Sequence, residues 1–270
     1  IKRMICPRKY LLLVFLTLAP CNSWADDAIP FRFCFEDKQL LPYYAGKGTQ
    51  VATPPGGTIE HLQAALRAMP QLQLQLQRKP WLRCLQLLEQ NKIDAVVATF
   101  TPARVYFAVF PMRADDTPDP SRALSHQASC LVQRQGDDVK SRQAQGLVYA
   151  RPLGYAVPGY ADNISVLPVE SQQKAIELVL QGRVDATTTL CEVDKITVPV
   201  DLADGLQLVY PPLYEATGYL VFSKAFYQRN PDLASALWLE LIKHRDASRY
   251  LRYLQLEPLS PETMPPQHEN

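Results

Sequence analysis

Three residues with hydrogen-bonding side chains, Thr99, Thr101 and Arg104, follow a short and largely apolar segment at residues 93–98. Short, continuous apolar segments are typical of strands that are covered on both faces of a sheet. In α/β sheets, ligands bind outside the carboxyl ends of the strands, and the three side chains lie at such an end. They are therefore candidates for binding a ligand, although Arg104 taken alone fits equally well an exposed ion pair of little energetic value.

A helix is expected directly before this strand. Trp81, Cys84, Leu85 and Leu88 recur at the spacing that places residues on one face of a helix. Asn91 stands where a residue in the left-handed conformation would end that helix. On such an apolar face, Trp81 by itself is more simply interpreted as a core residue than as a ligand contact.

Recognisable catalytic signatures are missing from the sequence, which has no G-x-S-x-G, no H-E-x-x-H and no Gly-rich phosphate loop. The histidines at positions 61, 126, 244 and 268 are scattered, and none falls in the predicted site. No C-x-x-C or Cys/His cluster offers the spacing of metal ligands. We therefore expect a binding protein rather than an enzyme, with no catalytic residues, no cofactor and no metal site.

The first 25 residues have the order of a secretory signal peptide. Basic residues at positions 2, 3, 8 and 9 precede an apolar run at residues 10–19, and Ser23-Trp24-Ala25 provides a small-x-small cleavage site. The apolar run is too short to span a bilayer. We expect cleavage after Ala25 and export to the periplasm. The alternatives are an uncleaved membrane anchor and a lipoprotein site at Cys21, which the preceding proline disfavours.

About 245 residues would remain after cleavage, enough for one large domain or two small ones. Lys and Arg number 28 and Asp and Glu number 27, so the chain is close to neutral. This balance provides neither a basic face for nucleic acid nor a polybasic segment for a membrane surface. The expected partner is a small molecule or a protein, and the expected state is a monomer.

A repeated unit divides the chain into two halves. Residues 87–95 are echoed by residues 178–186, and both copies read helix, left-handed cap, basic residue, β-branched residue, Asp-Ala and strand. Ser171 can cap the helix of the second copy. Two copies in matching contexts predict two similar lobes. Further strands are expected at 31–35, 73–77, 130–133, 147–150, 166–167, 206–210 and 218–223, helices at 58–69 and 231–254, and a linker at 113–127.

Four cysteines remain after the signal segment, namely Cys34, Cys84, Cys130 and Cys191. An even number in an exported chain favours disulfides. Three pairings are possible, and we prefer Cys34–Cys84 with Cys130–Cys191 because each bond then stays within one half. Buried free thiols are the alternative, since cysteine packs well as a small apolar residue.

From residues 31 to 253, the sequence resembles the periplasmic solute-binding proteins of the polar amino acid type, the family 3 receptors of ABC importers. The most specific part is residues 80–104, followed by Phe110-Pro111. The resemblance implies a two-lobed α/β fold of type II, in which each lobe has a central mixed sheet flanked by helices and two hinge segments join the lobes. Lobe 1 would comprise residues 26–126 and 218–257, lobe 2 residues 127–217, and residues 258–270 would form a loose tail.

The resemblance also implies roles for residues in lobe 1. Arg104 is similar to the arginine that holds a ligand carboxylate, and a planar guanidinium can make two charge-assisted bonds to that group. Thr99 and Thr101 resemble the strand-end donors beside it. Trp81 matches an aromatic position that stacks on the ligand, and Asp37 is similar to an acidic site residue.

In lobe 2, Gly154-Tyr155 resembles the turn before a helix whose N-terminal amides face the carboxylate. Family members that bind α-amino acids usually place an aspartate after the second Asp-Ala strand. Residues 189–191 read Thr-Leu-Cys here, and Glu192 is the nearest acid. This departure leaves the carboxylate site intact but argues against a standard α-amino-acid ligand.

The function implied is capture of a small carboxylate-bearing ligand, an amino acid or a related compound, for an ABC importer with a permease in the inner membrane. One alternative is a sensor that passes its bound state to a membrane kinase or another receptor. The other is an enzyme similar to the periplasmic cyclohexadienyl dehydratases, for which Asp37 and Glu192 would be the candidate acids or bases.

Overall fold

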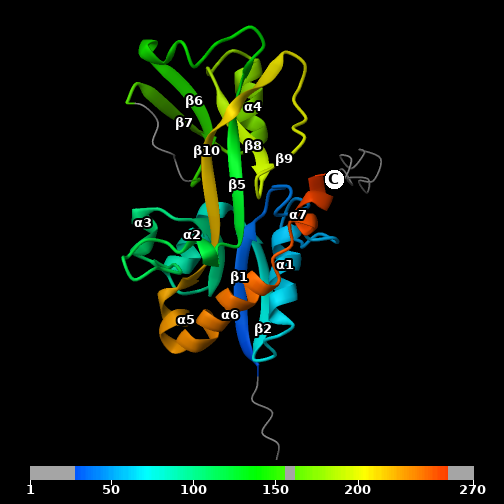
Figure 1. Cartoon of the computed structure of the whole chain (residues 1–270), viewed down its shortest axis with the longest axis vertical. Coiled ribbons are helices and arrows are strands. Elements are labelled where there is room, and N and C mark those ends of the chain that lie inside the picture. The colour runs from blue at the N-terminus through cyan, green and yellow to red at the C-terminus, as the bar shows by residue number, and fades with distance from the viewer. Residues whose placement is uncertain (1–27, 156–161, 255–270) are drawn as a thin grey trace, which may run out of the picture.

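The computed structural model describes residues 28–155 and 162–254. The expected signal peptide and C-terminal tail lie outside these described residues. The chain forms two lobes, one above the other in Figure 1, with two long strands running through both. None of the helices in the described ranges is long and apolar enough to cross a membrane.

Lobe 1 is built on the strand β1 (Ile29–Glu36), which pairs in parallel with β2 (Leu72–Lys79) and with β3 (Ala95–Thr99). Alternate residues of β1 face opposite sides of the sheet. Phe31 and Phe33 join a core with helices α1 and α6, whereas Cys34 joins a second core with α2. The remaining elements of this lobe are α1 (Gly57–Leu66), α2 (Trp81–Glu89), α3 (Pro102–Val105), β4 (Ala108–Val109), α5 (Lys224–Arg229), α6 (Pro231–Lys243) and α7 (Ala247–Leu254).

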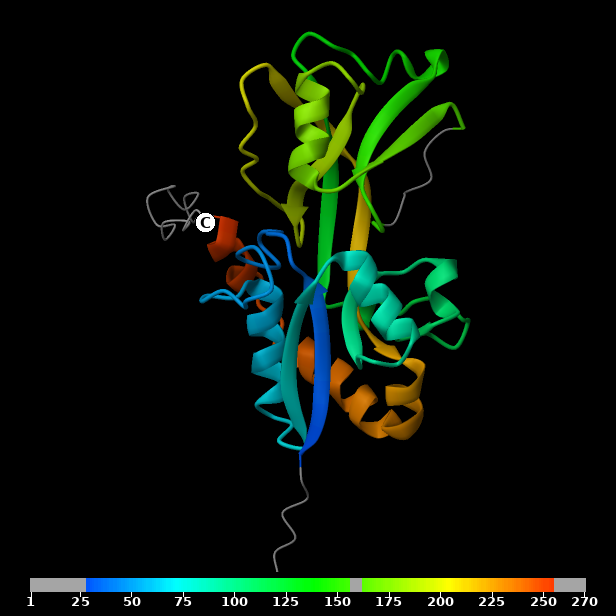
Figure 2. The same ribbon diagram turned by 180° about the vertical axis from the view of Figure 1, so that it is seen from behind.

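Lobe 2 contains a two-stranded parallel sheet, β6 (Leu147–Pro152) with β7 (Ile164–Val169), and the helix α4 (Gln172–Leu180). The strand β8 (Thr187–Val193) pairs with the short strand β9 (Ile196–Thr197). The side chain of Ser171 accepts a hydrogen bond from the Lys174 amide at 3.1 Å, which is the predicted cap of α4. Figure 2 shows α4 and the strands of this lobe from behind.

The two lobes are connected by β5 (Ser125–Arg134) and β10 (Leu206–Ser223), which pair antiparallel. The continuous sheet order is β2-β1-β3-β10-β5-β8-β9. The two strands expected at 206–210 and 218–223 are therefore one strand. The segment expected as a linker contains a 3-10 turn (Pro120–Arg122) and leads directly into β5. We propose that β5 and β10 form the hinge, with the lobe boundaries near the expected residues 126 and 217.

The repeated unit is equivalent in the two lobes. Asn91 and Gly182 end their helices with φ angles of 57° and 68°, as the sequence predicts. The carboxylate of Asp94 accepts from the backbone amide of Arg32 at 2.8 Å, and that of Asp185 accepts from the amide of Val148 at 2.8 Å. Each aspartate thus fixes its strand against the neighbouring parallel strand.

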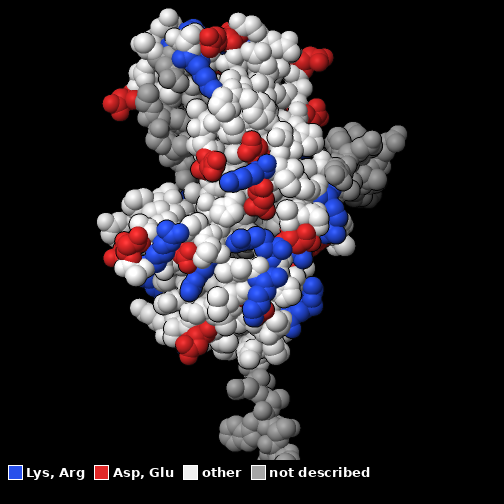
Figure 3. All heavy atoms as spheres, in the orientation of Figure 1, with Lys and Arg blue, Asp and Glu red and all other residues white. Residues whose placement is uncertain are grey.

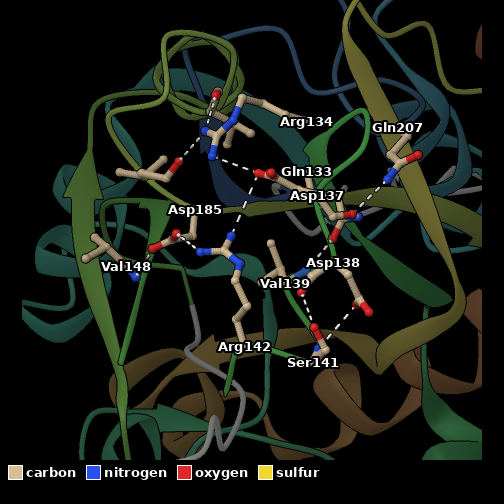
Figure 4. A network of polar contacts seen from close by, with 12 residues as sticks. Gln133, Arg134, Asp137, Asp138, Val139, Ser141, Arg142, Val148, Asp185 and Gln207 are labelled. Atoms are coloured by element: carbon tan, nitrogen blue, oxygen red, sulfur yellow. Dashed lines mark hydrogen bonds and ion pairs between the residues drawn. The ribbon is translucent and has the colours of Figure 1, made fainter. Parts of the chain in front are cut away.

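Asp94 and Asp185 each also pair with an arginine. Arg32 reaches Asp94 at 2.7 Å, and Arg142 reaches Asp185 at 3.3 Å. In lobe 2 the pair extends into a network, because Asp137 contacts Arg134 at 2.7 Å and Arg142 at 3.8 Å (Figure 4). The residues of this network in lobe 2 do not line the cavity described below, so we assign the network a structural role in lobe 2.

Both predicted disulfides are present. Cys34 and Cys84 join β1 to α2, and Cys130 and Cys191 join β5 to β8. The pairing preferred from the sequence is therefore confirmed, and each bond cross-links two elements of the same lobe.

We expect no titratable thiol in a denatured, unreduced chain that begins at Asp26, because all of its cysteines are then in these two bonds. Reduction before the titration should expose four thiols. The measurement is a colorimetric thiol assay in guanidinium, with the reduced sample as its control. Thiols found without reductant would contradict the pairing.

Candidate functional site

A cavity of about 470 Å³ lies between the lobes, and residues of both lobes line it. Its size is typical of sites for small ligands. Lobe 1 and the start of the hinge contribute Glu36, Gln39, Leu40, Leu41, Tyr43, Tyr44, Thr58, Trp81, Val97, Ala98, Thr99, Phe100, Thr101, Arg104, Ser125 and Gly218, and the remaining lining residues are Gln127, Ser129, Arg151, Pro152, Tyr155, Gln172, Thr188, Thr189, Leu190, Tyr214, Glu215 and Ala216.

Arg104 is a buried cation at this cavity. Its side chain is 8% exposed, and burial lowers the pKa of its guanidinium, which nevertheless stays charged. Thr101 is extended and Pro102 is the first residue of α3, so the chain turns back and brings Arg104 to the end of β3.

The hydrogen bonds of Arg104 go to backbone carbonyls. Its Nη1 donates to the Thr99 oxygen at 2.7 Å, and its Nη2 donates to the Gly154 oxygen at 2.8 Å. The guanidinium also lies 5.9 Å from the ring centre of Trp81. Among the residues that the structure describes, no Asp or Glu forms an ion pair with Arg104. Other N–H donors of its guanidinium are thus available to an anion.

Three other sequence-predicted residues of lobe 1 also line the cavity, namely Trp81, Thr99 and Thr101. Trp81 packs partly against the core of lobe 1 and donates from its indole nitrogen to the Gly154 oxygen at 3.1 Å. It therefore has the core contact and the cavity contact that the sequence left as alternatives. These residues come together because they all flank the carboxyl end of one strand.

Asp37, in contrast, is not among the residues that line the cavity, whereas its neighbour Glu36 is. The reason is the alternation of side chains at the end of β1, where a shift of one residue reverses the face. Glu36 is 9% exposed and accepts a hydrogen bond from the Tyr155 hydroxyl at 2.7 Å. Burial raises the pKa of Glu36, and the bond from Tyr155 opposes this effect.

The bond between Glu36 and Tyr155 crosses from one lobe to the other, as do the bonds that Gly154 receives. A further crossing bond runs from the Lys38 ammonium to the Glu170 carbonyl oxygen at 2.7 Å. Together these contacts hold the two lobes against each other beside the cavity. Figure 3 shows one face of the molecule, in the orientation of Figure 1, on which acidic and basic side chains are interspersed.

Neither Gly154 nor Glu192 lines the cavity, although the Gly154 oxygen accepts hydrogen bonds from two residues that do, Trp81 and Arg104. Gly154 presents its carbonyl oxygen to Arg104. The helix expected after it would fall on residues 156–161, which lie outside the described residues. Glu192 is half-buried on β8, opposite Thr197 in register.

Gly154 has no space for a side chain. Its φ is +79°, and a Cβ at this position would lie 2.6 Å from Leu82 Cδ2 and 2.9 Å from Trp81 Cδ1. Since Leu82 and Trp81 belong to lobe 1, an added methyl group would push the lobes apart. Glycine at this position therefore permits the close approach of the lobes.

We expect Gly154→Ala to bind ligand on the order of tenfold more weakly, because the enclosed state becomes less populated. Gly136→Ala is the matched control, since Gly136 has a φ of +81° and nothing within 4 Å of its added Cβ. Calorimetric titration of both variants checks this expectation. Equal affinities in the two variants would show that the contact of Gly154 with Leu82 and Trp81 does not affect binding.

A second buried arginine, Arg151 near the end of β6, was missed by sequence reasoning. It is 8% exposed, and its Nη1 donates to Thr188 Oγ1 at 3.2 Å and to the Tyr214 hydroxyl at 2.9 Å. Gln172 adds a bond to the Thr188 carbonyl oxygen at 2.7 Å. The available signal was a basic residue at the carboxyl end of a strand, the same signal that points to Arg104.

In the described part of the chain, no group of three or more His, Cys, Asp or Glu side chains is placed to hold a metal ion. The side chains that line the cavity carry guanidinium, hydroxyl, amide, carboxyl and aromatic groups.

No protein-family model and no curated protein matches the sequence. Solved structures do match. One matching structure comes from work on glutathione import in Gram-positive bacteria via GshT and the cystine ABC importer TcyBC of Streptococcus mutans. It has a TM-score of 0.59 at 13% identity, and the match covers 86% of this chain and 98% of that chain. A histidine kinase sensor domain with similarity to periplasmic binding proteins has a TM-score of 0.58 at 13% identity, covering 84% and 98%.

The ancestral amino acid-binding protein AncCDT-1, a precursor of cyclohexadienyl dehydratase, has a TM-score of 0.57 at 16% identity and covers 84% of this chain and 95% of that chain. At such low identity these likenesses show the fold. The chain has the two-lobed α/β fold of the periplasmic binding proteins, and the fold class predicted from the sequence is confirmed.

Proposed function

We propose that this protein is a periplasmic solute-binding protein, which captures a small carboxylate-bearing ligand between its lobes and delivers it to an ABC importer. The observation that carries the proposal is Arg104, a buried guanidinium at the cavity wall without an acidic partner among the described residues. Burying a charge is costly unless it is paired. A ligand carboxylate would provide that pair.

The other lining groups support the same proposal. Thr99 and Thr101 place hydroxyl groups at the end of β3, beside Arg104, and Trp81 offers an aromatic surface for an apolar part of the ligand. Two of the structural neighbours are described as a substrate-binding protein of an amino acid ABC transporter and as a probable amino-acid ABC transporter extracellular-binding protein, which makes binding the first choice for this fold. Fold alone does not fix function, so the residues of the cavity carry the proposal.

One specific observation supports each of two alternative functions, a sensor and an enzyme. A sensor role is favoured by the likeness to a histidine kinase sensor domain. An enzyme role is favoured by Glu36, since a buried carboxyl group with a raised pKa in a cavity can act as a general acid or base. Asp37 and Glu192, the acids expected from the sequence, do not line the cavity.

Mass spectrometry of the small molecules that accompany the gently purified protein tests the proposal. We expect a carboxylate at one copy per chain, and its addition should raise the melting temperature. A thermal-shift screen of amino acids and small carboxylates supplements this measurement. Conversion of excess ligand to a product would favour the enzyme instead, and a gene neighbourhood without a permease would favour the sensor.

A further inference from the structure

One wall of the cavity is formed by a long loop of lobe 1. Residues 37–56, all of them described, connect β1 to α1 and contain no helix or strand apart from an isolated bridge between Leu40 and Tyr44. Loops of this length without regular structure are uncommon in compact domains, and those that are ordered usually serve a function. The loop residues that line the cavity are Gln39, Leu40, Leu41, Tyr43 and Tyr44. The shape of the cavity therefore depends on what keeps this loop in place.

The guanidinium of Arg78 is bonded to the backbone of this loop. Arg78 lies near the end of β2, is 2% exposed and does not line the cavity. Its Nη2 donates to the Gly46 oxygen at 2.7 Å, and its Nη1 donates to the Gln50 oxygen at 3.0 Å. Its Nε donates to the backbone oxygen of Glu36, the last residue of β1, at 3.2 Å. A planar guanidinium with five N–H donors can bind several carbonyl oxygens in fixed directions.

The loop folds closely around this side chain. The guanidinium carbon of Arg78 lies 5.3 Å from the ring centre of Phe35, a buried residue of β1. On the side of the loop, a Cβ added at Gly46 would lie 3.3 Å from Arg78 Nη1 and 2.8 Å from Ala52 Cβ. Arg78 thus lies between the sheet of lobe 1 and the loop, and it contacts both.

The residues that Arg78 supports also meet lobe 2. The carboxylate of Glu36 accepts from the Tyr155 hydroxyl at 2.7 Å, while the backbone oxygen of the same residue accepts from Arg78. Lys38, at the start of the loop, donates to the Glu170 carbonyl oxygen at 2.7 Å. A change in the loop would therefore alter both the cavity wall and the contact between the lobes.

We propose that Arg78 is a positioning residue for ligand binding, which keeps residues 37–56 in the shape that forms one wall of the cavity and does not itself touch the ligand. The part of this inference that concerns binding rests on the proposed function. Without the guanidinium, the oxygens of Gly46 and Gln50 lose this donor, and the loop gains conformations in which its cavity residues are displaced. Affinity then falls because only a fraction of the molecules has the complete wall.

Hydrogen exchange followed by mass spectrometry on Arg78→Met, without added ligand, tests the effect on the loop. Amides bonded within the loop, such as those of Leu40 and Gly48, should exchange about tenfold faster than in wild type, whereas those of α2 and β3 should not change. Arg78→Lys should give an intermediate rate, since lysine keeps the charge but makes one point contact. Arg67→Met is the control, because Arg67 is exposed. Wild-type exchange of the loop in Arg78→Met overturns the inference.

Two glycines of the loop separate this contact from backbone strain. Gly46 and Gly48 have φ angles of +75° and +82°, so alanine is strained at both positions. Nothing lies within 4 Å of a Cβ added at Gly48, whereas a Cβ added at Gly46 meets Ala52 and approaches Arg78. Gly46→Ala should therefore speed the exchange of the loop more than Gly48→Ala does. Equal exchange in these two variants would contradict the close packing of the loop on Arg78.

Calorimetry with glutarate, L-glutamine and L-phenylalanine as probes measures the effect on binding. Any probe that the wild type binds should bind on the order of tenfold more weakly to Arg78→Met, and Arg78→Lys should recover part of the loss. Faster exchange of the loop with unchanged affinity would contradict a role in positioning while the proposed function stands. Binding of none of the probes to the wild type counts against the proposed function, and the exchange experiment then decides the inference alone. If Arg78→Met fails to fold, Arg78→Lys and Gly46→Ala decide.

Discussion

Arg104→Ala is expected to bind its ligand ~30- to several-thousand-fold more weakly, a loss of ~2–5 kcal/mol of binding free energy. The variant leaves a ligand anion in the cavity between the lobes without its main counter-charge. It also loses the bond to the Gly154 oxygen, through which Arg104 holds the lobes together. Arg104→Lys should also bind more weakly, since a point charge cannot reproduce two parallel hydrogen bonds.

The fold of Arg104→Ala should persist, because the side chain lines the cavity and belongs to no apolar cluster of the core. Its melting temperature without ligand should therefore stay close to that of the wild type. Arg113→Ala is a suitable control, since Arg113 is half-exposed and its pair with Asp119 is 3.8 Å long. Unaltered affinity in Arg104→Ala, measured by calorimetry, would assign Arg104 a purely structural role.

The second large effect concerns stability and the buried histidine His61. It is 0% exposed on α1, and both ring nitrogens are bonded, Nδ1 to the Tyr250 hydroxyl at 2.9 Å and Nε2 to the Leu241 carbonyl oxygen at 2.7 Å. A carbonyl oxygen only accepts, so Nε2 carries the proton and Nδ1 accepts from Tyr250. The neutral ring therefore links α1 to the end of α6 and to α7.

Burial lowers the pKa of His61 to about 4, from an ordinary value of 6.5. Below pH 6.5 the histidine of the unfolded chain binds a proton that the native protein does not bind. The contribution of His61 to the unfolding free energy is therefore fully present above pH 6.5 and is lost as the pH falls towards 4. The expected loss from this residue is about 3 kcal/mol of unfolding free energy. Acidic conditions should first weaken the attachment of the C-terminal helices.

Urea unfolding at pH 7 and pH 4, on the wild type and on His61→Gln, isolates this contribution from that of the carboxyl groups. The variant should be less stable at pH 7, and the difference from wild type should shrink by about 3 kcal/mol at pH 4. His244→Gln is the control, because the side chain of His244 is 40% exposed. A resonance of His61 that titrates near pH 6.5 would contradict the account.

The parts of the fold that the sequence predicted well depend on local pattern. The helix α2, its left-handed end at Asn91 and the buried strand β3 follow from apolar spacing and cap chemistry within a short segment. The disulfides followed from an even number of cysteines and from the repeat that divides the chain. Trp81 and Arg104 lie at one cavity because they flank the same strand.

The parts that the sequence missed depend on contacts between distant segments. Glu36 rather than Asp37 lines the cavity because the register at the end of β1 decides which side chain points inward. Arg151 has the same local signal as Arg104, a basic residue near the carboxyl end of a strand, but its place at the cavity depends on how lobe 2 lies against lobe 1. The single helix expected at residues 231–254 is divided into α6 and α7, with Asp246 accepting from the Ser248 amide at the new start.

The central claim is that this cavity binds a carboxylate through Arg104. Native mass spectrometry of wild type and Arg104→Ala, purified side by side under gentle conditions, tests it most directly. We predict that the wild type retains one small carboxylate per chain and that the variant retains none. A retained molecule without a carboxylate, or equal retention by both proteins, would contradict the claim.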